Sequence, residues 1–536
     1  MNVALLSLLL IGASPEAPDV VVVCPPAFRE ALSPWLAHRR EQGCHIDVVG
    51  PAVQVNNPDA WEQTRDAIRS VAKLNTTRYL LLVGDADAMA RGDAAISQCS
   101  VPTQYAIAKV NVKFGSEPHI ATDNGYADLD DDGLPDLATG RLTADSPREL
   151  ETMIGKILAW ERGSDDGGWR RRVNFVAGES GFGMLADAAL EGTTRAMLAT
   201  HIPPAFVTTM TYASWTSPYC PAPATFRETT IRRLSEGCLF WVYVGHGLPG
   251  HVDAMRTPSA AYPVLSKQDA PALVGENSAP IALMLACYTG AFDAWEDCLA
   301  EELLRAKGGP VAVVCGSRVT MPYAMCVLGR ELLVECFDNR AAAPQTIGDL
   351  VLRAKRNSLL KPRTDEQSKL FDGLASLLNP ASSDLTAERA EHLLLFNLLG
   401  DPLLRLNRPL PATVTAASTA SAGSTLLVRG TSPVDGPVEV ELVVRRDRLS
   451  FRPPVRKSFD ASPAAQAEFQ EVYERANDAR LASARVVAAS GQFAAELPIP
   501  VDASGECHVR VLVSGPGKTA IGSADVRIEP AKTARR

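Results

Sequence analysis

Two apolar runs define the architecture of this chain: Phe240-Trp241-Val242-Tyr243-Val244-Gly245-His246-Gly247 and Ile281-Ala282-Leu283-Met284-Leu285-Ala286-Cys287-Tyr288-Thr289-Gly290. Continuous apolar runs of this length are typical of strands that are buried on both faces of a parallel sheet. Each run ends in a reactive side chain, His246 in the first and Cys287 in the second. Because ligands bind at the carboxyl ends of the strands in open α/β sheets, both residues are candidates for a functional site.

The chain before these runs alternates strand-like and helix-like segments. The expected segments are a strand at Asp19–Cys24, a helix at 26–42, a strand at 45–50, a helix at 59–74 and a strand at Tyr79–Val83. This alternation predicts a parallel sheet covered by helices.

A stretch rich in loops, residues 86–145, interrupts the alternation, which then starts again. Around the two apolar runs we expect strands at Val173–Val176, Ala205–Met210 and Val311–Val314, and helices at 183–200, 224–236, 296–307, 324–338, 345–360 and 384–397. The fold class is therefore α/β, with two doubly wound units in tandem, the second being larger.

The composition changes after Pro409. Residues 411–424 are rich in Ala, Thr and Ser, and several later runs alternate apolar and polar residues like short strands: Thr425–Arg429, Val438–Val444 and His508–Val513. They predict a C-terminal β-sandwich, which a helical pattern at 458–486 interrupts. The expected domains are a signal peptide at 1–18, an N-terminal α/β subdomain with an acidic loop at 19–145, a catalytic subdomain at 146–409 and the sandwich at 410–536.

Composition and charge restrict the classes of partner. The 536 residues are 46% hydrophobic with a formal net charge of −9, and no block of Lys or Arg stands out. Nothing therefore indicates nucleic acid or an anionic membrane as a partner. Residues 1–14 form an apolar run of signal-peptide length, for which a buried first strand is the alternative, and no stretch is expected to span a membrane. We expect an exported protein that is secreted, periplasmic or at the cell surface.

The chain has an odd number of cysteines, eleven, and no CxxC pair. Zinc-ribbon and thioredoxin-type sites are therefore excluded. Several cysteines, among them Cys24 and Cys315, lie in apolar strands, where small buried thiols are common. Unpaired thiols are unusual in an exported protein, but one leftover thiol is also what a cysteine nucleophile would leave.

His246 and Cys287 together have the composition of a nucleophilic site. A thiolate nucleophile needs a nearby base or cation, which a histidine on an adjacent strand can supply. The N–H groups of Gly247 and Cys287 could form an oxyanion hole. The alternative is a buried cysteine and a strand-end histidine without a common task.

Beyond the pair, the order of several motifs resembles the gingipain-like cysteine peptidases of the caspase-like clan. These motifs are Gly245-His246-Gly247, Ala286-Cys287, the strand Gly309–Val314 that leads to Ser317-Arg318, and the closing Phe396-Asn397-Leu398-Leu399-Gly400-Asp401-Pro402. The resemblance covers roughly residues 19–407. It implies a caspase-like sheet in two subdomains, and the sandwich stands where that family has an immunoglobulin-like domain.

The resemblance also implies a chemistry for protein or peptide substrates. Cys287 would attack the scissile carbonyl and His246 would protonate the leaving amine. Glu179 matches the glutamate near the histidine, although it could simply cap a helix. Asp187 matches the aspartate that holds a substrate Arg or Lys, although it could simply be solvated. A transpeptidase of a secretion pathway and a non-catalytic binding protein on the same scaffold remain alternatives.

The acidic run Asp128-Leu129-Asp130-Asp131-Asp132-Gly133-Leu134-Pro135-Asp136 predicts a structural calcium site, with Asp128, Asp130, Asp132 and Asp136 as ligands. Carboxylates at alternate positions around a turn glycine suit a hard cation. Thr139 stands where an EF-hand needs a glutamate, so the run is not an EF-hand; an acidic surface turn is the alternative. We expect no cofactor for catalysis and reject a zinc site at His246, His251 and Asp253, since the spacing fits no helical zinc motif.

Overall fold

A computed structural model describes residues 17–163, 167–179, 200–275, 278–337, 345–378 and 384–531. Asp187, most of the helix expected at 183–200, and the apolar run up to residue 16 lie outside the described residues.

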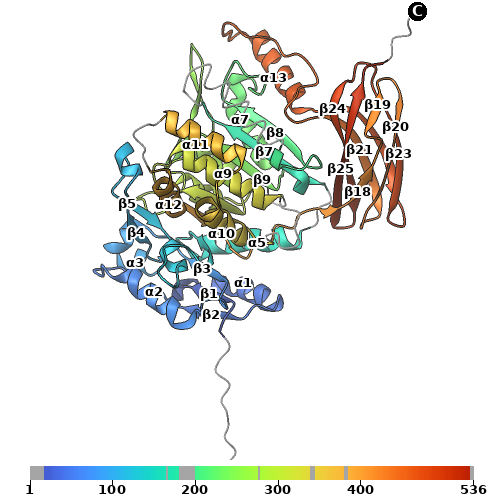
Figure 1. Cartoon of the computed structure of the whole chain (residues 1–536). Coiled ribbons are helices and arrows are strands. Elements are labelled where there is room, and N and C mark those ends of the chain that lie inside the picture. Colours follow the sequence, from blue (N-terminus) through green and yellow to red (C-terminus); the bar gives the residue numbers. More distant parts are fainter. Residues whose placement is uncertain are drawn as a thin grey trace, which may run out of the picture.

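A ten-stranded sheet forms the centre of the molecule (Figure 1). Its strands in spatial order are β2 (Ile46–Val49), β1 (Val20–Val23), β3 (Tyr79–Val83), β6 (Ala138–Leu142), β16 (Phe396–Leu399), β15 (Ala312–Gly316), β14 (Ile281–Leu285), β9 (Phe240–Val244), β7 (Arg172–Ala177) and β8 (Val207–Tyr212). The two expected α/β units thus share one sheet.

The two halves of this sheet run in opposite directions. Strands β2, β1, β3, β6 and β16 are parallel to one another, and so are β15, β14, β9, β7 and β8. The halves meet where β15 and β16 pair antiparallel, with Val314 opposite Leu398. Because β16 comes late in the chain but completes the N-terminal half, the C-terminal end of the α/β region holds the two halves together.

Helices cover both faces of the sheet. Strand β1 illustrates this, since Val20 and Val22 pack into the same core as Trp35, whereas Val21 and Val23 pack into the core that contains Ile68. The helices are α1 (Arg29–Glu41), α2 (Ala60–Val71), α5 (Pro147–Arg162), α7 (Phe226–Ser235), α8 (Leu299–Arg305), α9 (Pro322–Cys336), α10 (Ile347–Leu360), α11 (Glu366–Leu378) and α12 (Leu385–Leu395). Burial on both faces is the reason why these strands read as continuous apolar runs.

Short elements fill the connections. They are α3 (Ala94–Ser97) and α4 (Asn124–Ala127), and the hairpins β4 (Gln104–Ile107) with β5 (His119–Thr122), β10 (Gly247–Leu248) with β11 (His251–Val252), and β12 (Ala254–Arg256) with β13 (Ala261–Pro263). None of the described helices is both long and apolar enough to cross a membrane.

Three sequence predictions were wrong at element boundaries. The loop-rich stretch 86–145 contains β6, a strand of the main sheet. The helix predicted at 384–397 ends at Leu395, and the buried run Phe396–Leu399 forms β16 instead. The helical pattern at 458–486 ends at Asn477, because residues from Arg480 onward pair with β21 as a strand.

Two mainly antiparallel sheets form the C-terminal region. One contains β17 (Leu410–Pro411), β25 (Lys518–Glu529), β24 (Gly505–Gly515), β21 (Gly436–Val444) and β22 (Arg480–Ala488), with β19 (Thr419–Ser421) beside β25; the other contains β18 (Thr413–Thr415), β20 (Thr425–Thr431) and β23 (Gln492–Pro498). Their inner faces share a hydrophobic core that includes Val428, Val440 and Val511. Figure 1 shows these strands beside the α/β region.

Helix α13 (Pro463–Asn477) covers the open edge of the large sheet at β8. The Asn477 side chain accepts a hydrogen bond from Met210 N at 2.7 Å and donates one to Met210 O at 3.0 Å. The hydroxyls of Thr211 and Tyr473 are hydrogen-bonded at 2.9 Å. An amide side chain thus replaces the missing neighbour strand, which protects an edge that could otherwise pair with another chain.

Candidate active site

The predicted catalytic residues follow three neighbouring strands, at matching positions just beyond their carboxyl ends. Ala177 of β7 pairs with Val244 of β9, which pairs with Leu285 of β14. Glu179, His246 and Cys287 each follow these paired residues by two positions. Since neighbouring strands lie about 4.8 Å apart, the three residues line up across the carboxyl edge of this half of the sheet.

The strand pairing continues for one residue beyond the strand ends. Gly178 N donates to Val244 O at 2.9 Å, and Gly245 N donates to Leu285 O at 3.3 Å. The main chains that lead into Glu179 and His246 are therefore held in register up to the residue before each of them, and the main chain that leads into Cys287 is held up to Leu285.

Gly247 lies directly against the cysteine. A Cβ atom at Gly247 would lie 2.5 Å from Cys287 O, so that only glycine fits. The hydrogen bond from Asp253 N to His246 O, at 3.2 Å, makes Gly247 and Val252 a non-hydrogen-bonded pair of the β10–β11 hairpin. The Gly247 N–H consequently lies outside the hydrogen bonds of its own hairpin and can serve another acceptor.

The Cys287 thiol contacts Thr320, which follows β15. Thr320 N donates to Cys287 Sγ at 3.2 Å, and Thr320 Oγ1 lies 3.4 Å from the same sulfur. Thr320 is buried. Two potential donors therefore face the sulfur atom, an arrangement that suits a thiolate.

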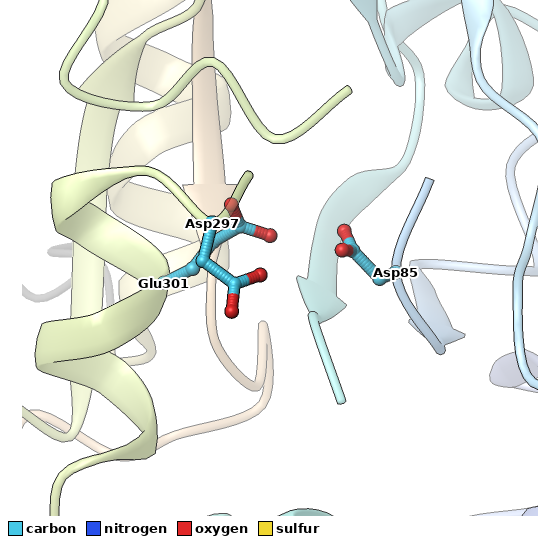
Figure 2. A group of neighbouring side chains, drawn as sticks. All are labelled: Asp85, Asp297 and Glu301. Carbon is cyan, nitrogen blue, oxygen red and sulfur yellow. The ribbon is translucent and has the colours of Figure 1, made fainter. Parts of the chain in front are cut away.

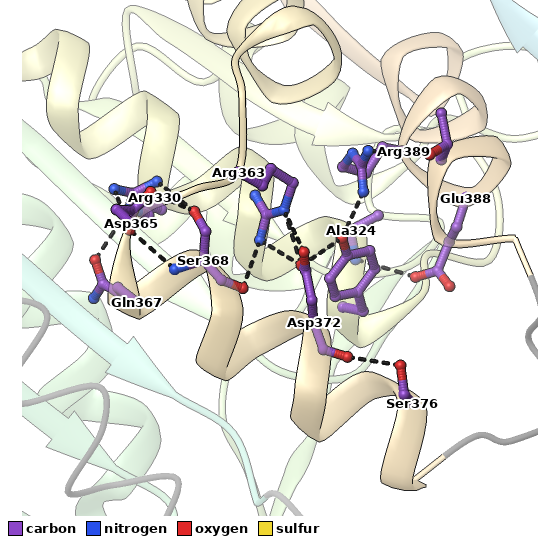
Figure 3. Close-up of polar contacts among 12 residues, drawn as sticks. Ala324, Arg330, Arg363, Asp365, Gln367, Ser368, Asp372, Ser376, Glu388 and Arg389 are labelled. Carbon is purple, nitrogen blue, oxygen red and sulfur yellow. Dashed lines mark hydrogen bonds and ion pairs between the residues drawn. The ribbon is translucent and has the colours of Figure 1, made fainter.

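The residues after Thr320 are held by a polar network between α9, α11 and α12, which Figure 3 shows. Arg389 donates to Tyr323 OH at 2.6 Å, and Tyr323 OH donates to Asp372 at 2.9 Å. His392 Nε2 accepts a hydrogen bond from Met321 N at 2.7 Å. The start of α9, and with it Thr320, is thus fixed from two neighbouring helices.

The residue after the cysteine has an unusual conformation. Tyr288 has a φ of 54°, in the left-handed region that non-glycine residues rarely adopt. Its N–H donates to Arg318 O at 3.1 Å, and its hydroxyl donates to Glu117 at 2.9 Å. Glu117 belongs to the loop between β4 and β5, so the N-terminal half of the molecule contributes to holding the turn at Cys287.

Of the other predicted site residues, Glu179 is half-buried and its Oε2 atom is shielded from solvent. His246 is exposed at the surface. Asp187 lies outside the described residues. Among the described residues, neither of the groups that could hold a metal contains His246, His251 or Asp253.

The acidic run forms a compact loop. Carboxylate oxygens of Asp128, Asp130 and Asp136 lie within 4.8 Å of one another, whereas Asp132 is not part of this group and accepts a hydrogen bond from Leu134 N at 2.7 Å. Burial raises the pKa of Asp136, and the neighbouring Asp130 and Asp128 carboxylates raise it further. Three oxygen donors that crowd one another fit a divalent cation.

A second acidic group connects the two halves of the sheet. Figure 2 shows Asp85, which follows β3, facing Asp297 and Glu301 at the start of α8. The buried Arg305 guanidinium lies 2.6 Å from Asp297 and 2.8 Å from Asp145. Burial raises the pKa of Asp85 and of Glu301. This group was not predicted, since its members are far apart in the sequence.

All eleven cysteines are free. Cys24 and Cys315 are fully buried, as the sequence predicted. Burial raises the pKa of Cys24, Cys220 and Cys336 to about 12. Such thiols carry almost no thiolate at neutral pH and are chemically inert.

Comparisons with known proteins show the family. The model of peptidase family C25 matches residues 13–407, and the chain therefore belongs to this family. The resemblance to gingipain-like peptidases is confirmed.

The relatives are similar at a distance. Lys-gingipain W83 of Porphyromonas gingivalis is 23% identical over 296 residues, which cover 54% of this chain and 15% of that protein. The chain thus spans only a small part of the curated relatives that it matches. The crystal structure of the Arg-specific cysteine proteinase gingipain R is similar with a TM-score of 0.54 and 16% identity, covering 96% of this chain and 99% of that chain. At this identity the structural likeness shows the fold alone.

Proposed function

We propose that this chain is a cysteine endopeptidase whose nucleophile is Cys287 and whose acid and base is His246. Membership of a peptidase family supports the reaction class. The proposal rests on one observation: His246 and Cys287 follow the paired residues Val244 and Leu285 of β9 and β14 by the same two positions. A thiolate and an imidazole side by side at the open edge of a sheet form an activated nucleophile.

The proposed reaction has two steps. The Cys287 sulfur attacks the scissile carbonyl carbon, and the N–H groups of Gly247 and Cys287 stabilise the oxyanion. His246 then donates a proton to the leaving amine as the C–N bond breaks, which leaves an acyl-enzyme. Water, deprotonated by His246, releases the acid and regenerates the thiol. Glu179 would orient the imidazole from the neighbouring strand β7.

Cleavage of peptides by the wild-type protein and by Cys287→Ala tests this proposal. We expect the variant to lose several orders of magnitude in rate while remaining folded. Residual activity close to that of the wild type would reject Cys287 as the nucleophile. Adding a free amine reports on the alternative reaction, since a transpeptidase would incorporate the amine into the product.

For specificity we propose Asp187 as the residue that binds a substrate Arg or Lys before the scissile bond. A carboxylate forms strong, charge-assisted hydrogen bonds with a guanidinium. Asp187→Asn should lower kcat/KM for Arg substrates far more than for apolar ones. Equal losses of kcat/KM for both kinds of substrate, or a wild-type preference for apolar residues, would show that Asp187 does not bind the substrate side chain.

We also propose that calcium stabilises the loop formed by Asp128, Asp130 and Asp136. A ligand that binds only the native state adds RT ln(1 + [L]/Kd), about 2.7 kcal/mol at a hundredfold excess over Kd. Millimolar calcium should therefore raise the Tm relative to chelator, and Asp130→Ala should remove the effect. Asp132→Ala is the matched control, and an equal calcium shift in both variants would reject this ligand set.

We also propose that the protein is exported, because residues 1–14 form an apolar run of signal-peptide length. By family resemblance, we further propose a caspase-like arrangement for the α/β region and an immunoglobulin-like one for the C-terminal sandwich.

A further inference from the structure

We propose that Tyr243 is the positioning residue of the catalytic histidine: its buried hydroxyl fixes the main chain at His246 and so sets the direction in which the imidazole leaves the sheet. This inference rests on the proposed function of His246. It assigns a role in positioning the catalytic histidine to a residue that lies in a strand rather than in a loop.

Tyr243 is a rigid support. It lies in β9, is fully buried, and its ring stacks on Trp241 with centroids 6.3 Å apart and an interplanar angle of 14°. His246, three residues later, is exposed at the surface. Because packing does little to hold an exposed ring, the backbone of His246 must set the direction of the bond by which its side chain leaves the sheet.

The hydroxyl closes a small ring of hydrogen bonds at the base of the β10–β11 hairpin. It donates to His246 O at 2.9 Å and accepts from Asp253 N at 3.3 Å. Asp253 N also lies 3.2 Å from His246 O. The carbonyl of the histidine is therefore held by one group from the strand and by one from the far end of the hairpin.

Two glycines leave space for this hydroxyl. A Cβ atom at Gly178 or at Gly245 would lie 2.7 Å from Tyr243 OH. Gly178 precedes Glu179, and Gly245 precedes His246. The hydroxyl thus lies where the main chains that carry both proposed catalytic residues approach each other, and a side chain at either glycine would displace it.

The hydroxyl remains protonated at neutral pH and can donate. Burial raises the pKa of Tyr243; the hydrogen bond from Asp253 N opposes this, and the Asp253 carboxylate and the Cys287 side chain add to it. A protonated phenol can donate to His246 O, which an ionised one could not.

The substitution Tyr243→Phe removes only this hydroxyl. We expect kcat for peptide cleavage to fall about ten- to a hundredfold, with KM changed less than about twofold, since small misplacements of a catalytic group have effects of that order.

Tyr126→Phe is the matched control. Tyr126 is also fully buried, and its hydroxyl also donates to a backbone carbonyl, Pro102 O, at 2.7 Å, but it lies in the separate core beside β1 and β3. Both variants lose a buried hydrogen bond, and only Tyr243→Phe should lower kcat. Identical kinetics of the two variants in an active enzyme would overturn the inference.

The substitution Gly178→Ala tests the space that surrounds the Tyr243 hydroxyl. The added methyl group collides with the hydroxyl, so the variant should lose stability in the wild-type background and clearly less in Tyr243→Phe, where that atom is absent. Equal losses in both backgrounds would contradict the packing argument. If Tyr243→Phe does not fold, Gly178→Ala should still lower kcat at unchanged KM, and a folded variant with wild-type kcat would overturn the inference.

The tests separate this inference from the proposed function. A wild-type chain that cleaves no peptide would remove the proposed function, and with it the role of Tyr243. An active wild type with an unaffected Tyr243→Phe variant would remove only the role of Tyr243.

Discussion

Individual atoms around Cys287 determine how reactive its thiol can be. The sulfur lies 3.2 Å from Thr320 N and 3.4 Å from Thr320 Oγ1. A hydrogen bond to a charged group contributes about 1.5–3 kcal/mol. The Thr320 N–H therefore donates to the sulfur, and the Thr320 hydroxyl lies between the sulfur and Met325 Sδ, 3.6 Å away, to either of which it can donate.

We predict that Thr320→Val slows alkylation of Cys287 by iodoacetamide about tenfold at pH 6, because losing a hydrogen bond of about 1.4 kcal/mol to the reacting sulfur corresponds to a tenfold lower rate. Thr289→Val is the control, since Thr289 is fully buried nearby and its hydroxyl has no hydrogen-bond partner among the described residues. A similar rate loss in both variants would indicate a general disturbance of the site.

At this scale the sequence predicts the reactive residues but not their supports. His246 and Cys287 can be predicted because each ends an apolar strand, and position at a strand end is a local property. Thr320 and the hydroxyl of Tyr243 act through contacts between neighbouring strands, which only the sheet order defines. The signal that could have indicated Thr320 is its place just beyond the carboxyl end of another apolar run, Val311–Val314.

At the scale of elements, most strands of the large sheet were predicted, whereas β6, β16 and β22 were not. Tyr79–Val83 forms β3 with the predicted bounds, because five buried residues in a row leave little choice. Strand β16 follows α12 without a break, so its apolar residues continue the helical pattern and hide the change of structure. Ala and Arg favour a helix in Arg480–Ala488, but pairing with β21 overrides that preference.

Helix α12 supplies a test based on pH. Burial lowers the pKa of His392 from 6.5 to about 4. Its ring accepts a hydrogen bond from Met321 N, and its Nδ1 donates to Glu388 O at 2.8 Å. The neutral form is therefore the folded one. Between about pH 6.5 and 4 the unfolded chain binds a proton that the folded chain does not, so this residue lowers stability as pH falls.

We predict that the wild-type free energy of unfolding falls by roughly 3 kcal/mol more than that of His392→Gln between pH 6.5 and 4, because folding lowers the pKa of His392 from 6.5 to about 4. Denaturant titrations across this range measure the difference. Parallel pH dependence of the two proteins would show that His392 does not titrate differently in the folded and unfolded states.

At the scale of the whole molecule, one buried cation joins the two halves of the sheet. Arg305 of α8 faces Asp85 and Asp145 of the N-terminal half as well as Asp297 and Glu301 of its own half. Its side chain is 9% exposed. Removing the charge would leave the buried carboxyl groups of Asp85 and Glu301 without this cation.

We therefore predict that Arg305→Met lowers the free energy of unfolding by about 3–5 kcal/mol, the usual effect of breaking a buried ion pair. Arg232→Met is the control, because its ion pair with Glu474 is exposed and should contribute less than about 1 kcal/mol. Chemical denaturation compares the two variants, and equal small losses would mean that the halves do not depend on Arg305.

The proposed Cys287–His246 pair is tested most directly by mapping which thiol reacts first. A substoichiometric dose of iodoacetamide at neutral pH, followed by mass spectrometry, reports on all eleven free cysteines at once. We predict that Cys287 is labelled far ahead of the other ten in the folded wild-type protein, and that His246→Ala removes this preference. Labelling spread over other cysteines, or a preference for Cys287 that persists unchanged in His246→Ala, would contradict the account.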